Sequence, residues 1–186
     1  MNKSQLKELE NIPLSDKQIR KLVNNKVSVI LYPNLVNYKT IEDVLGPYGA
    51  AFILFESKPK YGHWVLLFQL DECTLEFFNP YNGFPDDSLN YISINFRKIS
   101  NQLHTTLSRL MYKSPFCLTY NEFQFQEKNR NIKTCGRHCG FRLMNRFLNL
   151  YEYKDLISKL SKKYKTNADG VVTIETAWVT PLKNYN

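Results

Sequence analysis

The sequence predicts an α+β fold in which a central, mostly antiparallel sheet packs against a helix that begins at Cys135. Short apolar runs predict buried strands, because they are rich in β-branched and aromatic residues and too short for helices. Segment 141–151 instead carries apolar residues at helical spacing. The polar link 71–73 is short enough to join two strands as a hairpin. The three apolar runs are 50–55, 63–70 and 74–79.

The remaining elements follow without an internal repeat or a linker. Two short helices are expected where Ser15 and Thr40 can cap segments with helical spacing. A mixed helical pattern extends over 91–112, and the last predicted helix is basic. Further strands are predicted at 27–32 and 116–120.

We expect one domain over residues 1–186, with a polar lead-in at about 1–11 and a polar tail at about 166–186. Within that tail, Asp169-Gly170 is typical of a turn. A polar N-terminus and the lack of a long apolar run predict a soluble, intracellular protein without a membrane partner. We also expect a monomer. Cysteines of such a protein are expected to stay reduced.

A hydrophobic content of 43% with 14% aromatic residues excludes a disordered chain. The formal net charge of +8 indicates an anionic partner or simply a solvated basic surface. Because the lysines are scattered along the chain, the solvated surface is the favoured interpretation, and DNA stays a candidate partner or activator.

Cys135 stands immediately before glycine at the predicted start of a helix. Unpaired N–H groups and the helix dipole stabilise a thiolate at this position, and the thiolate is the nucleophilic form. Helical spacing places Cys135 on the polar side together with Arg142, and Cys139 at the boundary. We therefore expect Cys135 to face a cleft and Cys139 to help with packing.

His63 is the candidate base, at the start of a strand hydrophobic enough to be central in the sheet. If the hairpin link has three residues, His63 and Asn79 lie on the same face as diagonal neighbours, and the Asn79 amide oxygen can orient the imidazole. A link of four residues would place them on opposite faces. Segment 79–83 could equally be only a turn.

Cysteine, histidine and asparagine are the nucleophile, base and orienting group of a thiol protease site. Such a site also needs a donor for the oxyanion, the negatively charged oxygen that forms when the sulfur adds to the carbonyl. Gln126, paired with the backbone N–H of Cys135, is the first choice for this role, and Gln124 is the second.

A non-catalytic zinc module is an alternative, because Cys135, His138 and Cys139, with Cys117 or His63, are possible ligands. A continuous helix would separate these side chains, which disfavours the zinc site. On the catalytic interpretation, His138 is a surface residue or lies behind the site, and the remaining cysteines, Cys73 and Cys117, are packing residues.

Four motifs occur in a characteristic order. They are Gly62-His63-Trp64, the segment 75–81 with Asn79-Pro80-Tyr81, a glutamine, and Thr134–Cys139 with the sequence Thr-Cys-Gly-Arg-His-Cys. In this order they resemble the adenain-like viral maturation proteases of the SUMO-protease clan, in the form carried by Polinton-like elements, virophages and large DNA viruses. The resemblance spans residues 40 to 150.

The resemblance implies a cysteine endopeptidase fold, with Cys135, His63, Asn79 and Gln126 as catalytic residues. It implies cleavage of capsid or core precursor polypeptides after small, often glycine-containing sites, in the virion and in the viral factory of the host cytoplasm. A deubiquitinase or ubiquitin-like-protein protease of the same clan is the alternative. No cofactor is required, although DNA or a peptide could activate the enzyme.

The sequence departs from the family pattern at two places. Many relatives carry an acid where Asn79 stands, and the spacing from Gln126 to Cys135 is longer than usual.

Overall fold

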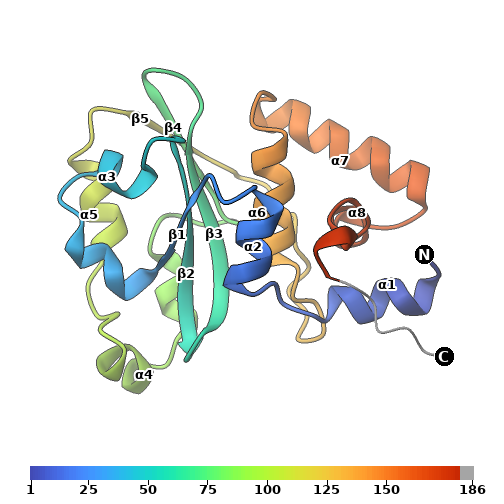
Figure 1. Ribbon diagram of the computed structural model, residues 1–186, viewed down its shortest axis with the longest axis horizontal. Helices are drawn as coiled ribbons and strands as arrows, with labels where there is room; N and C mark the ends of the chain where they lie inside the picture. Colours follow the sequence, from blue (N-terminus) through green and yellow to red (C-terminus); the bar gives the residue numbers. More distant parts are fainter. Residues whose placement is uncertain (181–186) are drawn as a thin grey trace.

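The computed structural model describes residues 1–180, which fold into a five-stranded sheet with helices on both faces (Figure 1). The strands are β1 (Ser28–Leu31), β2 (Ala50–Lys58), β3 (Tyr61–Gln69), β4 (Thr74–Phe78) and β5 (Cys117–Tyr120). The helices are α1 (Lys3–Glu10), α2 (Asp16–Leu22), α3 (Ile41–Leu45), α4 (Ile94–Ile99), α5 (Thr106–Tyr112), α6 (Cys135–Met144), α7 (Leu150–Tyr164) and α8 (Ala168–Glu175). Three 3-10 turns are η1 (Tyr32–Asn37), η2 (Asp87–Tyr91) and η3 (Ala177–Val179).

Two hydrophobic cores lie on opposite faces of the sheet. Successive side chains of a strand point to opposite faces, so Phe52 and Leu54 of β2 enter one core and Ile53 and Phe55 enter the other. The first core is closed by α2, α6, α7 and α8, and the second by η1, α3 and α5. Figure 1 shows these helices as two groups on either side of the sheet. An α+β fold is therefore confirmed.

The strands lie side by side in chain order. The pairs β2–β3 and β3–β4 are antiparallel, whereas β1–β2 and β4–β5 are parallel. The prediction of a mostly antiparallel sheet is thus correct for the centre and wrong at both edges. The edges differ because η1 and α3 carry the chain from β1 to β2, and a long helical connection carries it from β4 to β5.

The caps of the short helices are confirmed. Ser15 and Thr40 each accept a hydrogen bond from the backbone N–H three residues later, and each forms a capping box. The pattern over 91–112 is not one element, because it divides into α4 and α5 after η2.

The segment 141–151 is not a single helix. Helix α6 ends at Met144, and Asn149 begins α7 by accepting hydrogen bonds from the N–H groups of Tyr151 and Glu152. The break is stabilised by Arg142, which donates to the carbonyl oxygens at positions 145 and 148. Arg142 is buried, so its predicted place on a polar helix face is wrong.

The chain ends of the described region are more ordered than predicted. Asn2 forms a capping box for α1 within the expected lead-in. The expected turn at Asp169-Gly170 is wrong, because both residues lie inside α8 and are buried. Asn167 caps this helix, and Val171 and Val172 pack in the core. The part of the expected tail at 181–186 lies outside the described residues.

A buried ion pair connects α6 to the sheet. The Arg142 guanidinium donates from Nε to Glu76 Oε1 at 2.8 Å and from Nη2 to Glu76 Oε2 at 2.7 Å, and neither side chain is exposed. The guanidinium also lies over the rings of Phe68 and Tyr153, at 5.0 and 4.9 Å from their centroids. The two parallel hydrogen bonds of such a pair constrain the position of the helix end, in addition to the attraction between the two charges.

Replacing Glu76→Leu should destabilise the protein by about 3–5 kcal/mol, because it leaves the Arg142 charge buried without a partner. Adding Arg142→Met should recover part of this loss, since both charges are then removed. Urea denaturation of the two variants measures the difference.

The matched control is Arg20→Met, which breaks the exposed pair between Arg20 and Asp16 in α2. This exposed pair should contribute less than about 0.5 kcal/mol. A Glu76→Leu variant no less stable than Arg20→Met would show that the buried pair does not hold α6.

Candidate active site

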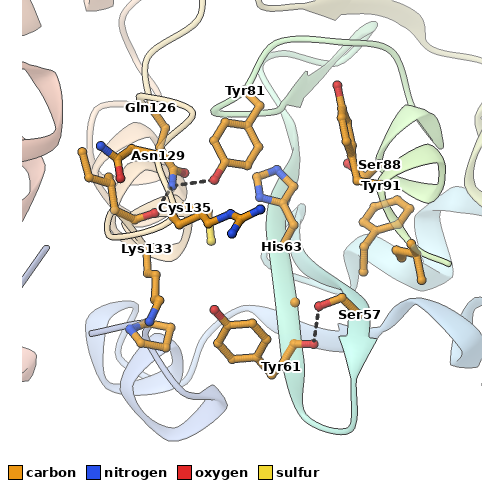
Figure 2. Close-up of a pocket in the computed structure, with 16 residues that line it drawn as sticks. Ser57, Tyr61, His63, Tyr81, Ser88, Tyr91, Gln126, Asn129, Lys133 and Cys135 are labelled. Atoms are coloured by element: carbon orange, nitrogen blue, oxygen red, sulfur yellow. Dashed lines mark hydrogen bonds between the residues drawn. The ribbon is translucent and has the colours of Figure 1, made fainter. Parts of the chain in front are cut away.

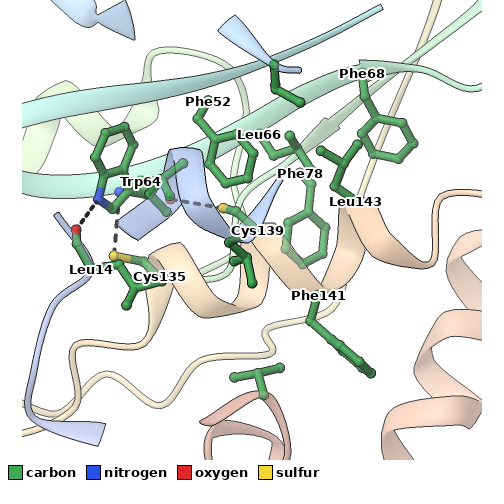
Figure 3. Close-up of a cluster of buried hydrophobic side chains, with 14 of the residues drawn as sticks. Leu14, Phe52, Trp64, Leu66, Phe68, Phe78, Cys135, Cys139, Phe141 and Leu143 are labelled. Atoms are coloured by element: carbon green, nitrogen blue, oxygen red, sulfur yellow. Dashed lines mark hydrogen bonds between the residues drawn. The ribbon is translucent and has the colours of Figure 1, made fainter. Parts of the chain in front are cut away.

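Helix α6 begins at Cys135, as the sequence predicts, with Thr134 as the preceding cap residue. The backbone N–H of Trp64 in β3 points at the Cys135 sulfur, 3.5 Å away, and Cys139 Sγ donates to the Trp64 carbonyl oxygen at 3.4 Å (Figure 3). Both cysteines of the helix therefore contact the backbone of one residue of the sheet, Trp64. Because His63 precedes Trp64, this contact brings Cys135 to the strand position of the proposed base.

Glycines allow the close packing that this arrangement needs. A Cβ at Gly140 would lie 2.0 Å from Leu22 Cδ2, and one at Gly136 would lie 3.1 Å from the Trp64 ring. At Gly62, before His63, a Cβ would lie 1.8 Å from the carbonyl oxygen of Phe55 on β2. The last contact is with backbone, so no side-chain movement can relieve it.

His63 and Asn79 meet as the three-residue hairpin link predicts. Leu66 pairs with Phe78, and the N–H of Leu70 donates to Thr74 O, which fixes the register. His63 Nε2 lies 2.8 Å from Asn79 Oδ1.

The surroundings of Asn79 fix the tautomer of His63. Asn79 Oδ1 also accepts a hydrogen bond from the backbone N–H of Tyr81 at 3.0 Å, so this atom is an acceptor. The His63 Nε2 must therefore carry the hydrogen, which leaves Nδ1 unprotonated. Asn121 holds the Asn79 backbone in place, accepting from its N–H and donating to its carbonyl oxygen, each at 2.8 Å.

Three of the four expected catalytic residues line one groove of about 510 Å³ (Figure 2), and Asn79 lies behind His63. Cys135, His63 and Gln126 lie on its walls, together with Tyr81. Arg130 and Lys133 give the groove a basic side. Cys135 is only 5% exposed, so the sulfur lies at the bottom of the groove, while Cys139 is fully buried, as the helical spacing predicts.

Gln126 is buried beside Cys135, whereas Gln124 does not line the groove. The Gln126 Nε2 donates to Tyr81 Oη at 3.0 Å and to Ile132 O at 3.2 Å. Its Oε1 has no hydrogen-bond partner. The Gln124 amide is occupied with Gln126 O, at 2.8 Å. The geometry therefore favours Gln126 over Gln124 for a role at the groove.

Burial shifts both reactive groups toward their neutral forms. Desolvation lowers the pKa of His63 to about 4, although the hydrogen bond with Asn79 acts in the opposite direction. Desolvation also raises the pKa of the Cys135 thiol, against the N–H groups of Trp64, Gly136 and Cys135 itself. Both shifts favour the neutral thiol and the neutral imidazole, contrary to the thiolate expected at a helix N-terminus.

A carboxylate that the sequence analysis missed holds the start of α6. Asp169 of α8 accepts hydrogen bonds from the Thr134 hydroxyl, from His138 Nε2 at 3.0 Å and from the Glu127 N–H at 3.0 Å. Burial alone would raise the pKa of Asp169, but these donors hold it below its ordinary value. The available sequence signal is Asn167 before an apolar run at 171–174, which is typical of a capped, buried helix.

His138 is fully buried against Asp169, so the expected surface position is wrong and the alternative position behind the site is the one observed. The zinc alternative is also wrong, because His138 points to α8 while Cys135 and Cys139 point to Trp64. Within residues 1–180, no group of three or more potential metal ligands comes together. Cys73 and Cys117 are exposed at the edge of the sheet, contrary to the predicted packing role.

Among the helices of residues 1–180, none has both the length and the apolar character needed to span a membrane.

A protein of Sputnik virophage, "Uncharacterized protein V9", is 47% identical over 172 residues, which cover 92% of this chain and 98% of the virophage protein. The chain belongs to the family of this virophage protein. No established family model matches the chain. This relative agrees with the viral origin that the resemblance implies.

Among solved structures, a chain titled "Crystal structure of the de-sumoylating protease" is 15% identical, with a TM-score of 0.33. The likeness covers 96% of this chain and 76% of the protease chain. A TM-score of 0.33 does not show that the two chains share a fold.

The rate at which iodoacetamide alkylates Cys135 should rise with pH through the alkaline range, because a raised thiol pKa moves thiolate formation to higher pH. Mass spectrometry of the Cys135 peptide measures this rate separately from the exposed cysteines. A rate already maximal at pH 6 and constant to pH 8 would instead indicate a preformed thiolate–imidazolium pair.

Proposed function

We propose that this protein is a viral cysteine endopeptidase that processes capsid or core precursor polypeptides during virion maturation. The observation that carries the proposal is the convergence on one groove of Cys135, at a helix N-terminus, and of His63, oriented by Asn79. Each of the three occurs in many proteins without a catalytic role, but their combination matches the needs of acyl transfer.

The first step forms an acyl-enzyme. His63 Nδ1 takes the proton of the Cys135 thiol while the sulfur attacks the peptide carbonyl carbon, and the carbonyl electron pair moves to the oxygen. Asn79 Oδ1 holds the Nε2 hydrogen and stabilises the imidazolium. The oxyanion lies near the Cys135 N–H and the Gln126 side chain. His63 then returns the proton to the leaving amine as the carbon–nitrogen bond breaks.

The second step releases the product. Water attacks the thioester carbonyl, His63 takes a proton from this water, and the proton goes to the departing sulfur. Neutral resting groups are compatible with this cycle, since the base needs a free Nδ1 and the thiol needs its proton.

The depth of the sulfur supports small residues at the cleavage site. With Cys135 only 5% exposed, a substrate backbone must approach the bottom of the groove closely, and glycine permits the closest approach. Kinship with a virophage protein supports a viral structural precursor as the substrate, with the virion and the viral factory as the place of action.

Purified protein should cleave structural precursors of the encoding virus, and Cys135→Ala should abolish cleavage while the protein still folds. His63→Ala should reduce the rate by about 10²–10⁴, the range for loss of a general base. Reactions with and without DNA test whether DNA activates the enzyme. Mass spectrometry of the new chain ends measures cleavage.

The matched control is Cys117→Ala, which removes an exposed cysteine and should leave the rate unchanged. Fluorogenic conjugates of ubiquitin and of SUMO serve as competing substrates. Cleavage of these conjugates and not of the precursors would support the ubiquitin-like-protein protease instead. Full precursor cleavage by Cys135→Ala protein would refute the nucleophile.

A further inference from the structure

Tyr81 contacts three of the proposed catalytic residues. Its ring stacks on the His63 imidazole, with centroids 4.6 Å apart and an interplanar angle of 16°. Its backbone N–H donates to Asn79 Oδ1, and its hydroxyl oxygen accepts a hydrogen from Gln126 Nε2. Figure 2 shows this hydroxyl pointing toward Gln126, on the side of the groove where Cys135 lies.

The position of Tyr81 is fixed by backbone contacts. The carbonyl oxygen of the preceding Pro80 accepts hydrogen bonds from the N–H groups of Phe125 and Gln126, each at 2.9 Å. The turn that carries Tyr81 is therefore attached to the segment that carries Gln126. These backbone bonds hold the two side chains next to each other.

A count of hydrogens separates the roles of Gln126 and Tyr81. A primary amide nitrogen has two hydrogens, and those of Gln126 Nε2 go to Tyr81 Oη and Ile132 O. Gln126 thus has no further hydrogen to give to an oxyanion unless one of these bonds breaks. The Tyr81 hydroxyl is the acceptor in its bond with Gln126, so its own hydrogen can be donated into the groove.

We propose that the Tyr81 hydroxyl donates directly to the oxyanion, and that Gln126 is a positioning residue that orients this hydroxyl. The inference rests on the proposed cysteine protease function and adds a catalytic residue to it. No proton is transferred by Tyr81, which only forms a hydrogen bond as negative charge develops on the substrate oxygen. Desolvation raises the pKa of Tyr81 to about 12, so the hydroxyl keeps its hydrogen at neutral pH.

Two reagents distinguish a residue that donates to the oxyanion from a residue that affects the reactivity of the Cys135 thiol. Iodoacetamide alkylates the sulfur by displacing iodide, and no oxyanion forms. The peptide aldehyde acetyl-Gly-glycinal reacts differently: the sulfur–carbon bond forms, the carbonyl electron pair moves to the oxygen, and the thiol proton goes to His63 or to that oxygen. Only the aldehyde adduct carries an oxygen on the carbon that is bonded to the sulfur, as the oxyanion does.

In Tyr81→Phe, which retains the ring over His63, the aldehyde should inhibit about 10²-fold more weakly, in line with the loss of one oxyanion donor. The iodoacetamide rate at Cys135 should stay within about twofold of the wild-type rate, because alkylation forms no oxyanion. The matched controls Tyr61→Phe and Tyr91→Phe, in the same groove, should change neither quantity.

A second variant tests the order of the two residues. In Gln126→Glu, a carboxylate accepts from the Tyr81 hydroxyl and turns its hydrogen away from the groove, so aldehyde binding should weaken to a similar extent. The double variant should be no weaker than either single one. Normal aldehyde binding by Tyr81→Phe, with weak binding by Gln126→Glu, would overturn the proposal in favour of Gln126 as the direct donor.

The reactions of wild-type Cys135 with the two reagents distinguish a failure of this inference from a failure of the proposed function. If Cys135 reacts with both reagents and Tyr81→Phe behaves like the wild type, the Tyr81 role is refuted and the protease proposal stands. If wild-type Cys135 reacts with neither reagent, both proposals are refuted.

Discussion

The site depends on the contacts that the Trp64 backbone makes with α6. The Trp64 N–H faces Cys135 and the Trp64 carbonyl oxygen accepts from Cys139, so the backbone of this one β3 residue sets both the depth and the rotation of α6. The indole N–H donates to Leu14 O at 3.0 Å, which adds the segment before α2 to the same assembly. Moving α6 by one residue along β3 would separate the sulfur from the groove that His63 lines.

Buried polar contacts hold α6 at both ends. The pair of Arg142 and Glu76 fixes its last turn to β4, and Asp169 fixes Thr134 and His138 at its first turn. Buried charges of this kind stabilise little by themselves, since desolvation offsets much of their attraction, but they disfavour alternative positions of the helix. We regard precise placement of Cys135 as their main effect.

The local features of the site could be predicted from the sequence. Glycine after Cys135 and the apolar spacing of α6 predicted the helix start, and the three-residue link predicted the meeting of His63 with Asn79. Both depend on residues that are close in sequence or on the fixed geometry of a hairpin.

The remaining features depend on how the C-terminal helices fold back. Periodicity assumes that a helix has one buried face, whereas α7 and α8 cover the other side of α6 and bury Arg142 and His138 as well. The same folding back turns an expected polar tail into the helix that supplies Asp169. Tyr81 was likewise missed, because its role follows from contacts with three side chains and not from a motif.

The most direct test of the account is a crystal structure of the protein after reaction with acetyl-Gly-glycinal. The account predicts a bond from Cys135 Sγ to the aldehyde carbon, with a His63 ring nitrogen within about 3.5 Å of the adduct, the reach of a hydrogen bond or proton transfer. An unmodified sulfur against Trp64, with the His63 ring turned away from it, would contradict the account.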